Sequence, residues 1–227
     1  MRATNPRPVF DPSTRTDPRP DRPRWRALRR VACVIASLAL IAAAVPARAG
    51  DGADAEPASR HGVQEWALKL GYGTSQRGQV EIMPVYGQAG WALPDAVDLP
   101  LRRHNVDIKW IVEAWAAGIH TPKSDAFEFG INPVEFKIAY DAGQQFVPFF
   151  QGGVGVMYTS LQDGLGLGGP FEFNEVAGLG LDMFCTKDFA LQISYRYRHM
   201  SNADLGDQNR GLDTQFVLLG FSFQPDR

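Results

Sequence analysis

The sequence has little cysteine and no excess of positive charge, and each shortage excludes a class of protein. Cys33 and Cys185 are the only cysteines among the 227 residues, and Cys33 lies in a segment that we expect to be removed. An intrachain disulfide and a cysteine-based metal site are therefore not expected. Residues 50–227 carry 13 Lys and Arg against 22 Asp and Glu, an acidic balance that argues against nucleic-acid binding.

A hydrophobic run of 18 or more residues is also missing after Ala49, so no membrane-spanning helix is expected there. The apolar stretch at residues 31–45 is shorter, comes after an Arg- and Pro-rich region, and ends at the small-residue sequence Ala47-Arg48-Ala49. This arrangement predicts a cleaved secretory signal peptide, with a retained membrane anchor as the alternative. We therefore divide the chain into a prefix and signal peptide at residues 1–49 and one domain at residues 50–227.

Beyond Ala49 the chain consists of short segments with the two-residue period of β-strands. In the clearest one, residues 106–116, apolar side chains share one face and Asp107, Lys109 and Glu113 share the other. Each segment has about ten or more residues, the length that a tilted transmembrane strand needs. We count eight of them, at residues 64–73, 79–91, 106–118, 126–140, 146–158, 171–184, 189–199 and 213–223.

Two features favour a transmembrane barrel over the alternative, a soluble β-barrel whose apolar faces form the core. The polar faces carry both signs of charge, and Glu65 with Lys69 and Asp107 with Lys109 are expected to pair inside a narrow barrel. Aromatic residues also lie near segment ends, as in interfacial girdles; they are Trp66, Tyr72, Trp91, Tyr158, Phe184 and Phe223. We therefore predict an all-β fold, an eight-stranded antiparallel transmembrane β-barrel in the bacterial outer membrane.

Two further expectations concern the course of the strands. The apolar parity of residues 126–140 switches across Asn132-Pro133, which predicts a β-bulge because proline cannot donate to a strand ladder. If both termini lie in the periplasm, the link at residues 200–212 is on the external side. An eight-stranded barrel is narrow, so side chains are expected to fill it and leave no channel.

Three residues in the last predicted hairpin could carry chemistry. His199 and Ser201 are two residues apart and share a strand face, and Asp213 opens the next segment on the same lipid-facing parity. A serine nucleophile, an imidazole base and an orienting carboxylate are the groups needed for acyl transfer. The alternative is that they are ordinary polar residues at the water boundary.

The sequence His199-x-Ser201-Asn202-Ala203, with Asn209-x-Gly211-x-Asp213 after it, resembles the motif of the lipid A 3-O-deacylases, the PagL family. The likeness covers most of residues 146–223. It implies that Ser201 is the nucleophile, His199 the base, Asp213 the orienting acid and Asn209 an oxyanion-stabilising residue. Asp213 stands where the family motif has Glu.

The resemblance further implies a serine ester hydrolase that removes the 3-linked hydroxyacyl chain of lipid A in the outer leaflet, with no metal or cofactor. Lipid A within lipopolysaccharide would be its membrane-embedded substrate. A non-catalytic structural or ligand-binding barrel and a transferase that moves the acyl chain to another acceptor are the alternatives.

Overall fold

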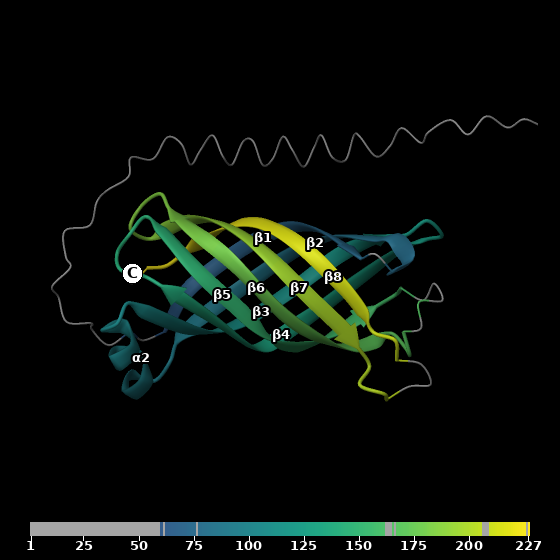
Figure 1. Cartoon of the computed structure of the whole chain (residues 1–227), viewed down its shortest axis with the longest axis horizontal. Coiled ribbons are helices and arrows are strands. Elements are labelled where there is room, and N and C mark those ends of the chain that lie inside the picture. Colours follow the sequence, from purple (N-terminus) through teal and green to yellow (C-terminus); the bar gives the residue numbers. More distant parts are fainter. Residues whose placement is uncertain are drawn as a thin grey trace, which may run out of the picture. The chain divides into compact units, whose positions relative to one another are not determined.

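In a computed structural model of the chain, the described residues are 60, 62–75, 77–161, 165, 167–205, 209–225 and 227. The expected signal peptide therefore lies outside the described residues. Eight strands succeed one another as an up-and-down meander (Figure 1). They are β1 (Val63–Ser75), β2 (Val80–Ala92), β3 (Val106–His120), β4 (Asp125–Tyr140), β5 (Phe146–Thr159), β6 (Phe171–Phe184), β7 (Phe189–Ser201) and β8 (Leu212–Phe223).

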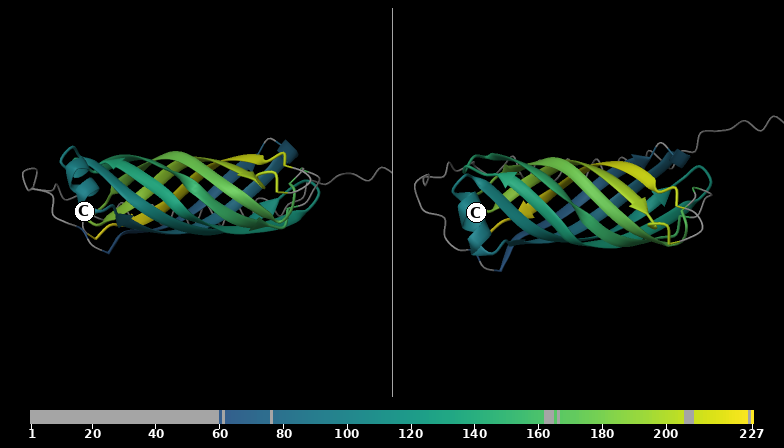
Figure 2. Two further views of the ribbon diagram at one scale, coloured as in Figure 1. Left: turned by 90° about the horizontal axis from the view of Figure 1, so that it is seen from below. Right: turned by 60° about the horizontal axis from the view of Figure 1, so that its bottom comes forward.

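Every strand pairs antiparallel with its neighbours in sequence, and β1 pairs with β8, so the sheet closes into a barrel without free edges (Figure 2). The eight predicted segments match the eight strands, and the predicted fold is confirmed. The predicted bulge is present too, because the register between β4 and β5 shifts between Ile131 and Val134. The indole of Trp110 donates to the carbonyl of Pro133 at 2.9 Å, which satisfies one backbone group that the bulge frees.

The two ends of the barrel differ. One end, here called the terminal end, holds Arg60, the C-terminal residues and the short helix α2 (Asp95–Arg102), which the strand pattern of the sequence does not predict. The opposite end, here called the loop end, holds the 3-10 turn η2 (Arg77–Gln79) and the links at 121–124, 160–170 and 202–211. No helix among the described residues is long and apolar enough to cross a membrane.

Apolar side chains cover the outside of the barrel, as the alternation predicts. Trp66, Tyr72 and Phe223 are exposed on this surface, at or near the strand ends where an interfacial girdle is expected. Phe184 corrects that prediction, because its side chain is buried inside the barrel. The inward residues of β6 are those with even numbers, and Phe184 continues that parity.

The interior toward the terminal end is a network of buried charges. Lys137 contacts Glu65 at 2.8 Å and Asp182 at 2.7 Å, and Lys109 contacts Glu65 at 3.1 Å. The predicted Asp107–Lys109 pair is present at 3.1 Å. The predicted Glu65–Lys69 pair is wrong, because Lys69 instead contacts Glu113 across the barrel at 2.7 Å. Across a narrow interior, a long side chain reaches a facing strand as easily as its own.

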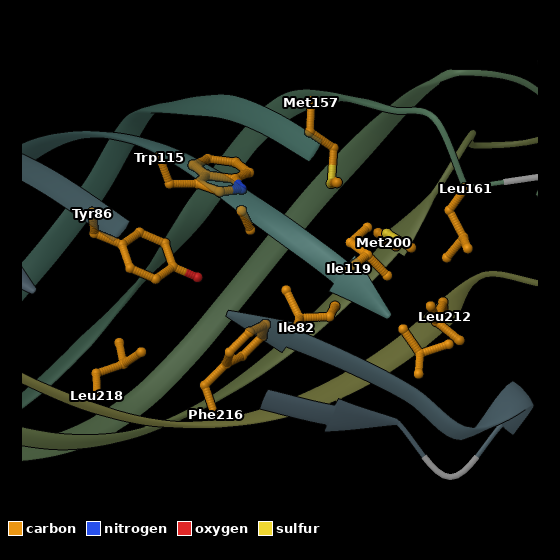
Figure 3. Close-up of a cluster of buried hydrophobic side chains, with 12 residues drawn as sticks. Ile82, Tyr86, Trp115, Ile119, Met157, Leu161, Met200, Leu212, Phe216 and Leu218 are labelled. Carbon is orange, nitrogen blue, oxygen red and sulfur yellow. The ribbon is translucent and has the colours of Figure 1, made fainter. Parts of the chain in front are cut away.

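Closer to the loop end, the interior contains a cluster of apolar side chains beside a buried ion pair between Arg198 and Glu128. Side chains from five strands and the β5–β6 link pack together there (Figure 3). The labelled members are Ile82, Tyr86, Trp115, Ile119, Met157, Leu161, Met200, Leu212, Phe216 and Leu218. We call this set the apolar plug. It fills the barrel directly behind the parts of β7 and β8 that carry the candidate site.

Candidate active site

The candidate site lies where β7 ends and β8 begins, at the loop end of the barrel. The register pairs His199 with Asp213 across the two strands, and the adjacent pair is Met200 with Leu212. Because side chains alternate between the faces of a sheet, His199 and Asp213 point outward while Met200 and Leu212 point into the apolar plug. The site is therefore on the outer surface of the barrel wall, and the inward-facing residues next to it are buried and apolar.

His199 and Asp213 form a direct hydrogen bond. Nδ1 of His199 lies 2.6 Å from Oδ1 of Asp213, and their side chains are 37% and 60% exposed. A carboxylate bound at Nδ1 leaves Nε2 as the nitrogen that can take a proton from a nucleophile. Tyr197, two residues before His199 on the same face, lies close enough to the Asp213 carboxylate to interact with it. The alternation of β7 predicts the face of Tyr197, but nothing in the sequence assigns it a role.

Ser201 is the last residue of β7 and is partly exposed. It lies two residues beyond His199 on the same face, about 7 Å along the strand. Among the described residues, its hydroxyl has no hydrogen-bond partner, so it is available to a substrate. Catalytic hydrogen bonds are often long in an empty site and tighten only when the substrate binds, so the lack of a hydrogen bond here does not argue against a contact between the hydroxyl and His199 in the complex.

Gly211 explains the glycine of the motif. Its φ of +56° lies in the left-handed region, which favours glycine. A Cβ at this position would also lie 2.6 Å from Cε1 and 3.0 Å from Nε2 of His199. The backbone at Gly211 is thus packed directly against the reactive edge of the imidazole, where no side chain fits.

Asn209 and Asn202 hold the link between the two strands. The backbone N–H of Asn202 donates to Oδ1 of Asn209 at 3.1 Å, and Nδ2 of Asn209 donates to Asp204 at 2.9 Å. Ala203 and Asp204 both have positive φ, which is unusual for residues with a side chain. Asn209 therefore stabilises a tight, strained turn next to Ser201, and its amide keeps a second N–H that these contacts leave free.

A second His–Asp pair on the barrel shows what is specific to this site. His120 at the end of β3 lies 2.6 Å from Asp125 at the start of β4, also at the loop end and facing outward. Two residues after His120, however, the chain has Pro122 where the candidate site has Ser201. The position that would supply a nucleophile is therefore occupied by a residue with no hydroxyl.

A shallow apolar groove of about 420 Å³ lies on the outer surface below the candidate site. Its floor and walls come from the outward faces of β6, β7 and β8: Leu179, Leu181, Ile193, Tyr195 and Val217. Tyr195 is four residues before His199, about 13 Å along the strand. The groove therefore lies about 13 Å from His199, toward the middle of the barrel wall, where its apolar side chains would contact a hydrocarbon chain.

The comparisons with known proteins agree with the geometry. A family model described as lipid A 3-O-deacylase (PagL) matches residues 86–222, which is more than half of the chain and includes the whole candidate site. Among curated proteins, no match reaches significance.

Among solved structures, the outer membrane enzyme PagL is 16% identical with a TM-score of 0.54, and the match covers 68% of this chain and 97% of that one. Neisserial surface protein A is 15% identical with a TM-score of 0.48, over 70% of this chain and 94% of that one. The family match and the shared barrel lead to one assignment: the chain belongs to the PagL family of lipid A 3-O-deacylases and is an outer-membrane β-barrel.

Proposed function

We propose that this protein hydrolyses the 3-linked acyl ester of lipid A in the outer leaflet, with Ser201 as nucleophile, His199 as base and Asp213 as orienting acid. The observation that carries the proposal is the 2.6 Å contact between His199 and Asp213 on the outward face that also bears Ser201. The loop end then faces the cell exterior. A site on the outside of the wall, at the level where strands end, meets a substrate that stays in the membrane.

In the first half-reaction, Oγ of Ser201 attacks the ester carbonyl while Nε2 of His199 takes its proton, and Asp213 stabilises the resulting imidazolium. The tetrahedral oxyanion needs hydrogen-bond donors, and the free N–H of the Asn209 amide is the candidate. Collapse breaks the bond between the carbonyl carbon and the sugar oxygen, and His199 returns the proton to that oxygen. An acyl-serine and a free sugar hydroxyl result.

In the second half-reaction, Nε2 of His199 takes a proton from water as the water oxygen attacks the carbonyl carbon of the acyl-serine. The bond between that carbon and Oγ of Ser201 then breaks, the imidazolium returns the proton to Oγ, and the fatty acid is released. The apolar groove below the site suits the acyl chain, since its outward-facing aliphatic and aromatic side chains match a hydrocarbon. The same acyl-serine could pass its acyl group to another acceptor, and the match to a deacylase family is what favours water over such an acceptor.

The test is mass spectrometry of lipid A from a bacterium that lacks such an enzyme and expresses this chain. Loss of one 3-linked hydroxyacyl chain, with the free hydroxy fatty acid as product, is expected from the wild type. Ser201→Ala should leave lipid A at its full mass, because removing a nucleophile costs several orders of magnitude in rate. Heat-modifiable gel mobility would show that the variant still forms a barrel. Full activity in Ser201→Ala would reject Ser201 as the nucleophile.

A further inference from the structure

Two of the few positively charged residues in the links of the loop end, Arg77 and Arg210, lie next to each other. Those links contain three Lys or Arg residues in all: Arg77, Lys123 and Arg210. Nη1 of Arg77 donates a hydrogen bond to the backbone carbonyl of Arg210 at 2.9 Å, although the two residues are 133 positions apart. This contact ties η2, which comes after β1, to the segment that leads into β8. Two of the three cations therefore lie together.

The Arg77–Arg210 pair borders the candidate active site. Arg210 stands between Asn209 and Gly211, and Gly211 packs against the imidazole of His199. The charge of Arg77 acts on the carboxylate of Asp213. The pair is thus on the β8 and β1 side of the site, at the water boundary rather than in the apolar groove.

The two arginines differ in what they can still bind. Arg77 is half-buried, its Nη1 is used by the carbonyl of Arg210, and its Nη2 is enclosed without a partner. Arg210 is exposed, and in the part of the chain that the structure describes its guanidinium makes no ion pair with a carboxylate. Arg77 therefore holds the segment in place, and the exposed side chain of Arg210 belongs to the residue directly before Gly211, beside the site.

Charge of the opposite sign lies on the other side of the site. Glu175 on β6 is the register partner of His199 and is exposed on the outward face. A ligand that spans the site therefore meets the carboxylate of Glu175 toward β6 and the guanidinium of Arg210 toward η2. The exposed carboxylate of Asp204 lies in the same link as Arg210 and contacts Asn209. A molecule that carries an anionic group on one side of its ester is therefore favoured with that group toward Arg210. It is disfavoured with that group toward Glu175, because like charges repel.

We propose that Arg210, held by Arg77, binds a phosphate group on the glucosamine headgroup of lipid A and so orients the ester over Ser201. This inference rests on the proposed function and adds a headgroup subsite to it. Guanidinium groups recognise phosphate through paired, charge-assisted hydrogen bonds. The phosphate lies in the headgroup layer, at the level of Arg210, while the acyl chain extends into the groove below.

The experiment uses the full-length protein in detergent micelles with two lipid A preparations that differ only in their phosphate groups. Fatty-acid release is measured as a function of lipid concentration. We expect the wild type to prefer the phosphorylated lipid by about tenfold or more in kcat/KM, the size of effect that a charge-assisted hydrogen bond produces. Arg210→Gln should lose this preference mainly through a higher KM, and Arg210→Lys should keep part of it.

Lys123→Gln is the matched control, because it removes a cation from another link of the same end, and it should keep the wild-type preference. Equal rates of the wild type on both lipids would overturn the phosphate subsite while leaving the deacylase function in place. An equal loss of kcat/KM on both lipids in Arg210→Gln would also overturn the phosphate subsite. It would mean that Arg210 only supports the structure of the loop, because a structural role affects both lipids alike. If the wild type released fatty acid from neither lipid, the proposed function itself would be rejected, and the subsite with it.

Discussion

Gly211 and His199 are in direct contact across the last hairpin, and the backbone of Gly211 packs against the imidazole ring on the side of Cε1 and Nε2. The motif glycine is therefore part of the site's shape as well as of its turn. Steric contact with Cε1 and Nε2 is what makes this position intolerant of a side chain.

Gly211→Ala is expected to reduce deacylation by at least about a hundredfold, because displacing a catalytic group by about 1 Å can have an effect of that size. Gly143→Ala is the control. Gly143 also has a positive φ, of +78°, but a Cβ there would meet no atom within 4 Å. The measurement is the rate of lipid A deacylation by folded protein, verified by heat-modifiable mobility. Similar losses in both variants would mean that backbone strain, rather than the contact with His199, is responsible.

Asp213→Asn should lose most of the activity, by about four orders of magnitude if Asp213 has the full role of a triad acid. An amide cannot stabilise the imidazolium and can hold the ring in the wrong tautomer. Asp213→Glu should retain measurable activity, because the family motif has Glu at this position. Asn has nearly the same shape as Asp and differs from it mainly in charge, so comparable activity in Asp213→Asn and the wild type would contradict the assignment of the acid.

Lys137→Met should destabilise the barrel by about 3–5 kcal/mol, the usual effect of leaving buried charges without a partner. Lys137 neutralises both Glu65 and Asp182 in the interior. Lys187→Met is the control, because Lys187 is exposed and its contact with Asp188 is long, at 3.8 Å. Urea unfolding in lipid vesicles, monitored by tryptophan fluorescence, measures the difference. A midpoint shared by the two variants would show that the interior network adds little to stability.

Spin labels at cysteine replacements of residues 192 and 193, in a chain in which Cys185 is replaced by serine, test the orientation of β7. Gln192 is buried inside the barrel and Ile193 is exposed on its outer surface. The label at 193 should be relaxed by oxygen dissolved in the lipid, and the label at 192 should be protected. The reverse pattern would place His199 and Ser201 inside the barrel and remove the structural basis of the proposed function.

The strands could be predicted from the sequence because two-residue alternation is a local property, and each predicted segment agrees with a strand to within a few residues at its ends. The bulge at Asn132-Pro133 was predictable for the same reason, since a change of parity is visible in the sequence. The partners of buried charges were not. Lys69 pairs with Glu113 on β3, because in a closed barrel the neighbours across the interior depend on strand tilt and register.

The candidate site also has features that were predictable from the sequence and features that depend on the fold. The shared parity of His199, Ser201 and Asp213 is local, and the structure brings the first and third into contact. Arg77 could not be connected with the site from the sequence, because it lies more than a hundred residues away and approaches only when β1 pairs with β8. The helix α2 was missed because it has only eight residues, includes Pro100 and lies in a link between two strand patterns.

The apolar plug has a consequence for the membrane as a whole. Near the loop end the apolar plug and the buried Arg198–Glu128 pair occupy the described interior, and ion pairs such as that of Lys137 with Asp182 occupy the part toward the terminal end. A narrow barrel crowded in this way is expected to leave no channel. We therefore expect that a bacterium can place many copies of this protein in its outer membrane without weakening that membrane as a permeability barrier. Under the proposed function the reaction takes place on the outside of the wall, so the quantity of enzyme and the permeability of the membrane can be adjusted independently.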